Sequence, residues 1–156
     1  MVDRNELNRE QLEQWLDESG LSHYVCDQCH GLHLPRLQEL EGVTDSRLFV
    51  EPWGLLLSTE IVVRPTAILP LATDLTRLNI DYPVLKLFLD IVDDAMPQLV
   101  SGASLLTGAG LTGAQFIHFL TTSIEATRQL VAEMTHLDYI LPDENTPQGP
   151  RESRVH

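Results

Sequence analysis

The sequence predicts an α+β fold in which an antiparallel β-sheet is flanked by three helices. Two observations carry this prediction. Strand-like runs follow one another with short turns between them, and helical periodicity is confined to three separate segments. In a doubly wound parallel fold, single strands would alternate with helices, whereas here the runs pair locally. The expected order is helix, β-meander, helix, β-hairpin, helix.

Three segments carry the signals of amphipathic helices. Residues 8–19 begin with Asn8 and Gln11 at capping-box spacing and are followed by a glycine stop. A second helix is expected from Pro65 to about residue 79, where leucines recur at i, i+4 and i+7. His118 is expected to be a partly buried packing residue of the last helix. That helix follows a second capping box at 112–115 and carries the longest apolar stripe: Phe116, Phe119, Leu120, Ser123, Ile124, Thr127, Val131 and Met134.

The remaining segments are predicted to be strands from their aliphatic and β-branched residues and from the Pro and Gly turns between them. They form a meander of four runs and a later hairpin of two runs: 23–26, 31–34, 43–50, 55–63, 85–91 and 98–107. We expect a single domain over residues 1–142. Residues 143–156 are polar and rich in proline, which indicates a flexible tail.

The charge of the chain argues against some classes of partner. Ten Lys and Arg residues stand against 23 Asp and Glu residues, which gives a net charge of −13 with His neutral. Lys86 is the only lysine, and the arginines are scattered rather than clustered. Nucleic acids and anionic membrane surfaces are bound by clustered basic residues, so we expect neither as a partner. The acidity agrees instead with contacts to other proteins.

The sequence also predicts a cytoplasmic protein. The segment before residue 21 is acidic and polar, and so does not resemble a secretory signal. Residues 95–124 contain no charged side chain, but Pro97, several glycines and many Ser and Thr residues make them too polar to span a membrane. Two cysteines in such a chain indicate a reducing compartment, where a structural disulfide is not expected.

Cysteine and histidine gather between residues 26 and 33. Cys26 and Cys29 form a Cys-x-x-Cys pair on one tight turn, which can hold one edge of a tetrahedral metal site with His33 or His30 as a third ligand. No second ligand pair follows later in the sequence. The favoured interpretation is therefore a β-turn whose small Cys side chains pack against the sheet. A zinc site formed by Cys26, Cys29 and His33 is one alternative, and a redox dithiol is the other.

Two further motifs are interpreted as turns. Residues 108–113 match the G-x-G-x-x-G pattern, but the strand before them is expected to be the return arm of a hairpin, and a dinucleotide site needs a parallel βαβ unit. Asp90, Asp93 and Asp94 suit turn chemistry, and their spacing matches no calcium-binding loop. No nucleophile, base and carboxylate stand in a catalytic pattern. The sequence thus predicts no enzyme activity and no cofactor other than the zinc alternative.

Four stretches of the sequence together resemble the YbjN family of bacterial proteins. They are residues 14–17, the segment 26–35 with its Cys-x-x-Cys pair, the Arg-Pro to Asp-Leu block at 63–75, and residues 88–100. The block at 63–75 is the most specific, and the resemblance covers about residues 8–142. Within the family, the chain looks most similar to enterobacterial members that include AmyR-type regulators of exopolysaccharide production.

The resemblance implies a fold similar to type III secretion chaperones and a regulatory role in exopolysaccharide production, motility, biofilm formation and virulence. It implies no catalytic residues. We therefore expect a non-enzymatic regulator, monomer or homodimer, that acts through an unidentified protein partner. Two alternatives stay open. One is a thiol- or zinc-based sensor built on Cys26, Cys29 and His33. The other is a chaperone-like protein that holds an extended partner along an exposed sheet face or edge.

Overall fold

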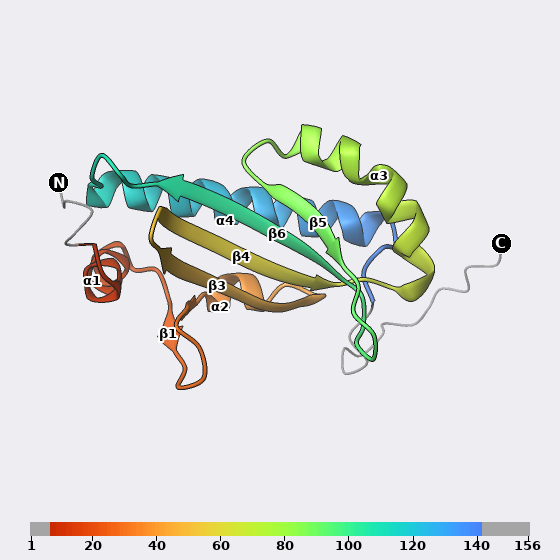
Figure 1. The fold of residues 1–156 in the computed structure, drawn as a ribbon, viewed down its shortest axis with the longest axis horizontal. Helices are drawn as coiled ribbons and strands as arrows, with labels where there is room; N and C mark the ends of the chain where they lie inside the picture. The colour runs from red at the N-terminus through yellow and green to blue at the C-terminus, as the bar shows by residue number, and fades with distance from the viewer. Residues whose placement is uncertain (1–6, 142–156) are drawn as a thin grey trace.

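A six-stranded antiparallel sheet organises residues 7–141, the part of the chain that the computed structural model describes (Figure 1). The strands lie in the order β1-β2-β3-β4-β6-β5, and every neighbouring pair is antiparallel. Their bounds are β1 Tyr24–Val25, β2 Leu32–His33, β3 Val43–Glu51, β4 Gly54–Val62, β5 Lys86–Asp90 and β6 Gln98–Leu106. The predicted α+β fold, with its meander and its hairpin, is confirmed.

The helices are α1 Arg9–Ser19, α2 Pro35–Gln38, α3 Ile68–Asp81 with the 3₁₀ turn η1 Pro65–Ala67 before it, and α4 Gly113–His136. The three predicted helices are therefore confirmed, and α2 is an addition to them. Its four residues are too few for an apolar period to be visible in the sequence. Pro35 stands at the first helical position, where its missing N–H group costs little, and Leu37 is fully buried.

Capping explains why α1 and α4 begin where the sequence predicts. The Asn8 side chain accepts a hydrogen bond from the Gln11 N–H group at 2.9 Å. Gly20 ends α1 in the left-handed conformation, with φ 73°. At the start of α4, the side chains of Thr112 and Gln115 each accept a hydrogen bond from the backbone N–H group of the other residue. This reciprocal pair is the predicted capping box.

The apolar stripe of α4 forms much of the core, with some corrections. Phe116 and Leu120 are fully buried, as predicted, but Phe119 is only partly buried, and Leu130, which the prediction omits, is fully buried. His118 is exposed, so the expected packing role is wrong. Phe119 and His118 both line a groove beside β6, where the sheet does not extend over α4.

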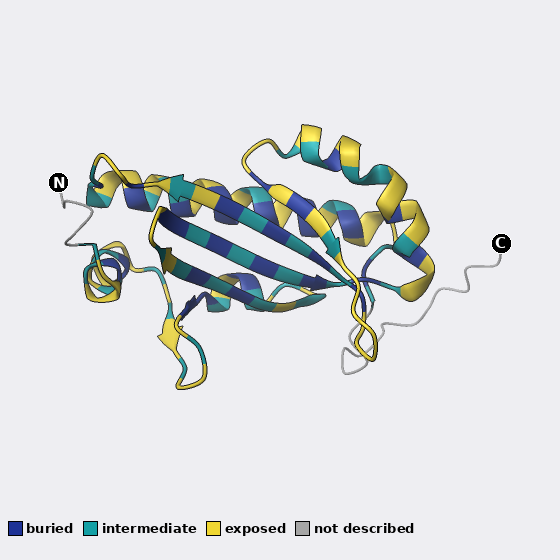
Figure 2. Ribbon diagram, in the orientation of Figure 1, coloured by how far each residue is buried: buried dark blue, intermediate teal, exposed yellow. Residues whose placement is uncertain are grey.

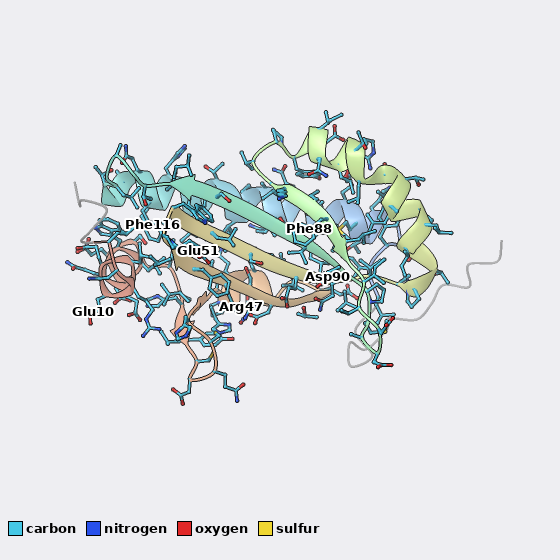
Figure 3. All side chains as sticks on the ribbon, viewed as in Figure 1. Glu10, Arg47, Glu51, Phe88, Asp90 and Phe116 are labelled. Atoms are coloured by element: carbon cyan, nitrogen blue, oxygen red, sulfur yellow. The ribbon has the colours of Figure 1, made fainter. Side chains whose placement is uncertain are left out.

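One face of the sheet is covered and the other is open (Figures 1 and 2). α4 lies across the covered face, and none of the helices within residues 7–141 lies across the other one. Arg47, Phe88 and Asp90 belong to this open face (Figure 3). Alternate residues of the central strands are buried on the covered face: Ser46, Leu48, Leu57, Thr59, Ile61, Leu99, Ser101 and Ala103.

The β5–β6 hairpin joins the sheet through its second strand, because β6 pairs with β4 and leaves β5 at the edge. α3 lies beside this edge (Figure 1). The side chain of Asn79 in α3 donates a hydrogen bond to the Leu87 carbonyl at 3.1 Å and accepts one from the Leu87 N–H group at 2.9 Å. Asn79 therefore takes the place of a further strand at this position.

Residues 107–112 connect β6 to α4, the last glycine of the motif begins α4, and β6 is the return arm of an antiparallel hairpin. The interpretation of this glycine-rich segment as a turn is thus confirmed. Across residues 7–141, no helix has both the length and the apolar character needed to cross a membrane. The predicted tail, residues 143–156, lies outside the described residues. The assignment of a single domain to residues 1–142 stays a prediction.

Candidate metal and thiol centre

Three donor atoms converge at the β1 edge of the sheet. Cys26 and Cys29 lie in the turn that joins β1 to β2, and His33 is the last residue of β2. The two sulfur atoms are 2.9 Å apart. The His33 Nε2 atom lies 3.2 Å from the Cys26 sulfur and 3.1 Å from the Cys29 sulfur. The structure therefore brings together the three residues that the sequence suggests as ligands.

The local backbone explains how the turn reaches His33. β1 and β2 pair Tyr24 with His33 and Val25 with Leu32, so the loop between them must fold back over one side of a very short hairpin. Gly31 makes this possible, because a Cβ atom at this position would lie 2.9 Å from the Phe49 ring. A larger residue at position 31 would push the loop away from β3.

A carboxylate of β3 fixes the orientation of the His33 ring. The Nδ1 atom of His33 lies 3.0 Å from Asp45 Oδ1, and a carboxylate only accepts, so Nδ1 carries the hydrogen. In the neutral ring, the lone pair of Nε2 then faces the two sulfur atoms. Asp45 Oδ1 also accepts hydrogen bonds from the Gln38 side chain and from the Ser46 N–H group, each at 2.8 Å. Histidines that bind metals are commonly oriented by a carboxylate in this way.

An aromatic ring covers His33 from the side of β1. The Tyr24 ring stacks on the His33 ring, with centroids 4.6 Å apart and an angle of 5° between the planes. The Tyr24 hydroxyl donates a hydrogen bond to Gln38 Oε1 at 2.9 Å. Because of these contacts, His33 is only 6% exposed, although it lies at the edge of the sheet. Side chains from β1, α2 and β3 thus surround the imidazole.

The surroundings of Cys29 favour its thiolate. The hydrogen bond from Cys26 lowers the pKa of Cys29 most, and a backbone group of Gly31 and the positive charge of Arg47 lower it further, against an opposing effect of burial. Arg47 is held in place by Glu60, with Nη2 3.2 Å from Oε1, and by Asp45, with Nε 3.4 Å from Oδ2. Thiolate is the form of cysteine that binds metals and that reacts with oxidants.

The pKa values of His33 and Asp45 shift in opposite directions. Burial acts to lower the pKa of His33, but its hydrogen bonds with Cys26 and Asp45 outweigh burial and raise that pKa. Burial acts to raise the pKa of Asp45, but hydrogen bonds from Gln38, His33 and the Ser46 backbone outweigh it and lower that pKa. The raised pKa of His33 favours its protonated form, and the lowered pKa of Asp45 favours the carboxylate, so each group stabilises the charged form of the other.

The donor set fits a soft divalent cation such as zinc. Two thiolates and one imidazole are ligands that zinc takes in proteins. A tetrahedral zinc ion would hold the two sulfurs about 3.8 Å apart, and each sulfur about 3.6 Å from the nitrogen. The three donor atoms lie closer together than this, so binding would need each pair to separate by less than about 1 Å. Three protein ligands leave a fourth position for another group.

The structure distinguishes between the two histidines that the sequence offers as a third ligand. His30 is exposed and does not belong to the group of converging donors. Among residues 7–141, Cys26, Cys29 and His33 form the one such group of three or more His, Cys, Asp or Glu side chains. Asp90, Asp93 and Asp94 do not form another. The choice between His33 and His30, open in the sequence, is therefore decided by β-pairing.

Three residues that support the centre are missed by the sequence analysis. Asp45, Gln38 and Tyr24 belong to three different elements, and none stands at a spacing typical of metal sites. Only the pairing of β2 with β3, which sets His33 opposite Arg47, brings Asp45 close. The signal available in the sequence was a carboxylate, Asp45, on the predicted strand that follows His33 in the meander.

Comparisons with known proteins agree with this fold. The family model of YbjN, described as "Putative bacterial sensory transduction regulator", matches residues 8–136. The chain is 38% identical over 138 residues to the uncharacterized protein YbjN of Escherichia coli strain K12, and the match covers 88% of this chain and 87% of that protein. The identity and the coverage are the same for YbjN of Shigella flexneri.

A solved structure extends the likeness to three dimensions. The crystal structure of YbjN from E. coli matches with a TM-score of 0.84 at 38% sequence identity, over 88% of this chain and 97% of that one. Sequence and structure therefore agree over nearly all of the described residues, and this chain belongs to the YbjN family.

Proposed function

We propose that this chain is a non-enzymatic regulator whose signal input is a zinc-binding centre formed by Cys26, Cys29 and His33. One observation carries the proposal: two sulfurs and one imidazole nitrogen lie within 3.2 Å of one another, and the imidazole is oriented by a carboxylate. Both cysteines are half-buried, so solvent ligands and small signals have access to them. The description of the family as sensory regulators agrees with this role.

Metal analysis of the freshly purified chain tests the proposal directly. We expect close to one zinc ion per chain in the wild type and none in Cys29→Ser, because serine is a poor ligand for zinc. His30→Gln is the matched control, since His30 lies in the same loop but outside the group of donors. A folded wild-type chain that binds no added zinc, or a Cys29→Ser chain that keeps its zinc, would contradict the metal centre.

The same sulfurs support a second candidate, a thiol sensor. The 2.9 Å separation of the Cys26 and Cys29 sulfurs and the lowered pKa of Cys29 favour oxidation to a disulfide. With hydrogen peroxide as the oxidant, the two thiols lose two protons and two electrons, one S–S bond forms, and the peroxide is reduced to two water molecules. Mass spectrometry then finds a chain lighter by two hydrogen atoms. A chain that stays fully reduced in peroxide would exclude this candidate.

The proposed output of the regulator is contact with another protein in the cytoplasm. An open sheet face, a charge of −13 and the lack of clustered basic residues support protein binding over nucleic-acid binding. The processes we propose to be controlled are those that the family resemblance implies: exopolysaccharide production, motility, biofilm formation and virulence. A deletion strain complemented with the wild type, Cys29→Ser or His30→Gln tests this link. Equal exopolysaccharide and motility phenotypes for all three chains would show that the metal and thiol centre has no part in the regulation.

A further inference from the structure

A groove of about 660 Å³ lies between β6 and α4, at the opposite edge of the sheet from the metal and thiol centre. Its walls are the last residues of β6, the first half of α4, the turn after β6 and the turn before β5. Val84, Leu106 and Phe119 supply apolar surface to it. Leu106 is 77% exposed, and Val84 is 47% exposed, which is unusual for large apolar side chains that lie close together.

The groove exists because β5 is shorter than β6. β5 pairs with Gln98–Gly102 only, while β6 continues to Leu106, and Figure 1 shows β6 running on past the start of β5. Before β5, the chain turns away from the sheet into α3. Leu85 donates its N–H group to the Tyr82 carbonyl at 2.9 Å, which closes this turn. Beyond residue 102, β6 continues to residue 106, and no strand among residues 7–141 pairs with it on this side, so the described part of the chain leaves a place for four further strand residues beside β6.

The vacant place presents hydrogen-bonding groups of the backbone. Leu87 directs its N–H and C=O groups outward to Asn79, so Lys86 and Phe88 direct theirs to β6. By the same alternation, Ser104 and Leu106 direct their N–H and C=O groups into the groove. Within residues 7–141, no backbone or side-chain group bonds to these four polar groups. Asn79 bonds to the backbone groups of Leu87, whereas no side chain of the described residues does the same for Ser104 and Leu106.

We propose that this groove binds an extended peptide segment of a partner protein, which adds as a strand beside residues 103–106 of β6. The inference rests on the proposed function only in assuming an output through protein contact. Donor and acceptor pairs that repeat at about 6.8 Å along β6 match the backbone of another strand better than they match a compact ligand. Phe119 and Val84 lie where side chains of such a strand would be buried.

Charge determines the chemistry of the partner. None of the described residues that line the groove is Asp, Glu, Lys or Arg, so the inserted residues must be uncharged. The chain as a whole carries −13, so basic residues on either side of the inserted segment would be attracted to it. The same charge disfavours a second copy of this chain as the occupant, because each copy would bring another −13. The partner segment is therefore a short apolar strand with basic flanks.

A peptide array tests the proposal. The probes are octapeptides with two lysines at each end and every combination of Val, Leu, Thr and Phe at the central positions, and binding to the full chain is measured by fluorescence anisotropy. The best binder is then N-methylated at alternate central residues, in two versions. Strand addition predicts that only the version whose N–H groups face β6 loses affinity, by about tenfold or more. Equal affinity of both versions, or no binder in the array, would overturn the proposal.

Two protein variants complete the test. Leu106→Lys and Leu69→Lys change the charge equally, at residues that are 77% and 78% exposed, but only Leu106 lines the groove. We expect about tenfold weaker peptide binding for Leu106→Lys and wild-type binding for Leu69→Lys. Equal binding by the two variants would also overturn the proposal, as would a dimer in sedimentation that Leu106→Lys dissociates. The zinc content of each sample is also measured, so a failure of peptide binding is distinguished from a failure of the proposed metal centre.

Discussion

The two edges of the sheet are closed by different means. At the β1 edge, two-residue strands are held by a polar cluster in which Asp45 accepts hydrogen bonds from His33 and Gln38. At the β5 edge, a five-residue strand is covered by α3, and one side chain, Asn79, replaces the missing neighbour. The first edge depends on ionisable and metal-binding groups, whereas the second depends on helix packing and a neutral amide.

This difference agrees with separate roles for the two edges in the proposed regulator, signal input at β1 and partner binding near β5. Short strands bury little apolar surface, so the β1 hairpin gains its order from the polar cluster and is sensitive to metal or oxidation. The β5 edge is covered by α3 instead, and a groove lies beside β6 at the same side of the sheet. A signal input at one edge and a docking site at the other would then be separated by the hydrophobic core that both edges contact.

The largest expected effect tests that shared core. Phe116 is fully buried and packs against Trp15, with ring centroids 5.6 Å apart. Phe116→Ala should destabilise the protein by about 3–5 kcal/mol, measured by urea denaturation. Phe119→Ala should cost about 1 kcal/mol, because that ring is only partly buried. Equal costs for the two substitutions would mean that the groove beside Phe119 is filled in solution.

The next effect concerns the β1 edge alone. Asp45→Asn removes the charge that orients His33, and loss of such a carboxylate should weaken zinc binding by about 10–100-fold. Glu60→Gln is the matched control, since Glu60 also pairs with Arg47 but does not contact His33. Competition with a chromogenic zinc chelator measures both affinities. If Glu60→Gln lowers the zinc affinity as much as Asp45→Asn does, the loss of a nearby negative charge is responsible rather than the orientation of His33.

A smaller effect is expected at the β5 edge. Asn79→Ala leaves the N–H and C=O groups of Leu87 without their partner, and we expect a loss of about 1 kcal/mol because water can replace part of the interaction. Hydrogen exchange of the Leu87 amide should become faster, while zinc affinity stays unchanged. An equal change in the exchange of Val25, at the opposite edge, would show that the two edges are not independent.

The smallest effect is a pH dependence of the α3–α4 contact beneath the β5 edge. Hydrogen bonds from Arg77 lower the pKa of Asp74 from its ordinary value of 3.8, and the Tyr139 hydroxyl contributes in the same direction. A lowered pKa in the folded state stabilises the protein above pH 3.8, and this contribution is lost as the pH falls through the folded value. Arg77 also binds Glu133 of α4, which links the two helices.

Urea denaturation at pH 7 and pH 3 measures that dependence. Asp74→Asn should lower the stability at pH 7 and should lower it less at pH 3, because the contribution of the lowered pKa fades as the pH falls below 3.8. The control is Asp93→Asn in the exposed β5–β6 turn, which should have little effect at either pH. A loss of stability in Asp74→Asn that is equal at both pH values would point to packing rather than to charge.

Local patterns allowed most of the elements to be predicted from the sequence. Asn8, Gly20 and Thr112 set helix ends through contacts with residues only a few positions away, so their effect does not depend on the rest of the fold. α2 was missed because one turn is shorter than the period that identifies a helix. The favoured sequence interpretation of Cys26 and Cys29 as packing residues could not include Asp45, since no local rule brings it to His33.

The sequence by itself determined the α+β class, the caps, the turns and the candidate ligands Cys26, Cys29 and His33, because these depend on residue type and short spacing. The tertiary structure alone decided that His33 rather than His30 faces the sulfurs, that Asp45 orients it, and that β6 extends beyond β5. These features arise from strand register and from the relative lengths of distant segments. Register depends on burying alternate residues of the central strands on one face of the sheet, and no short stretch of sequence encodes either feature.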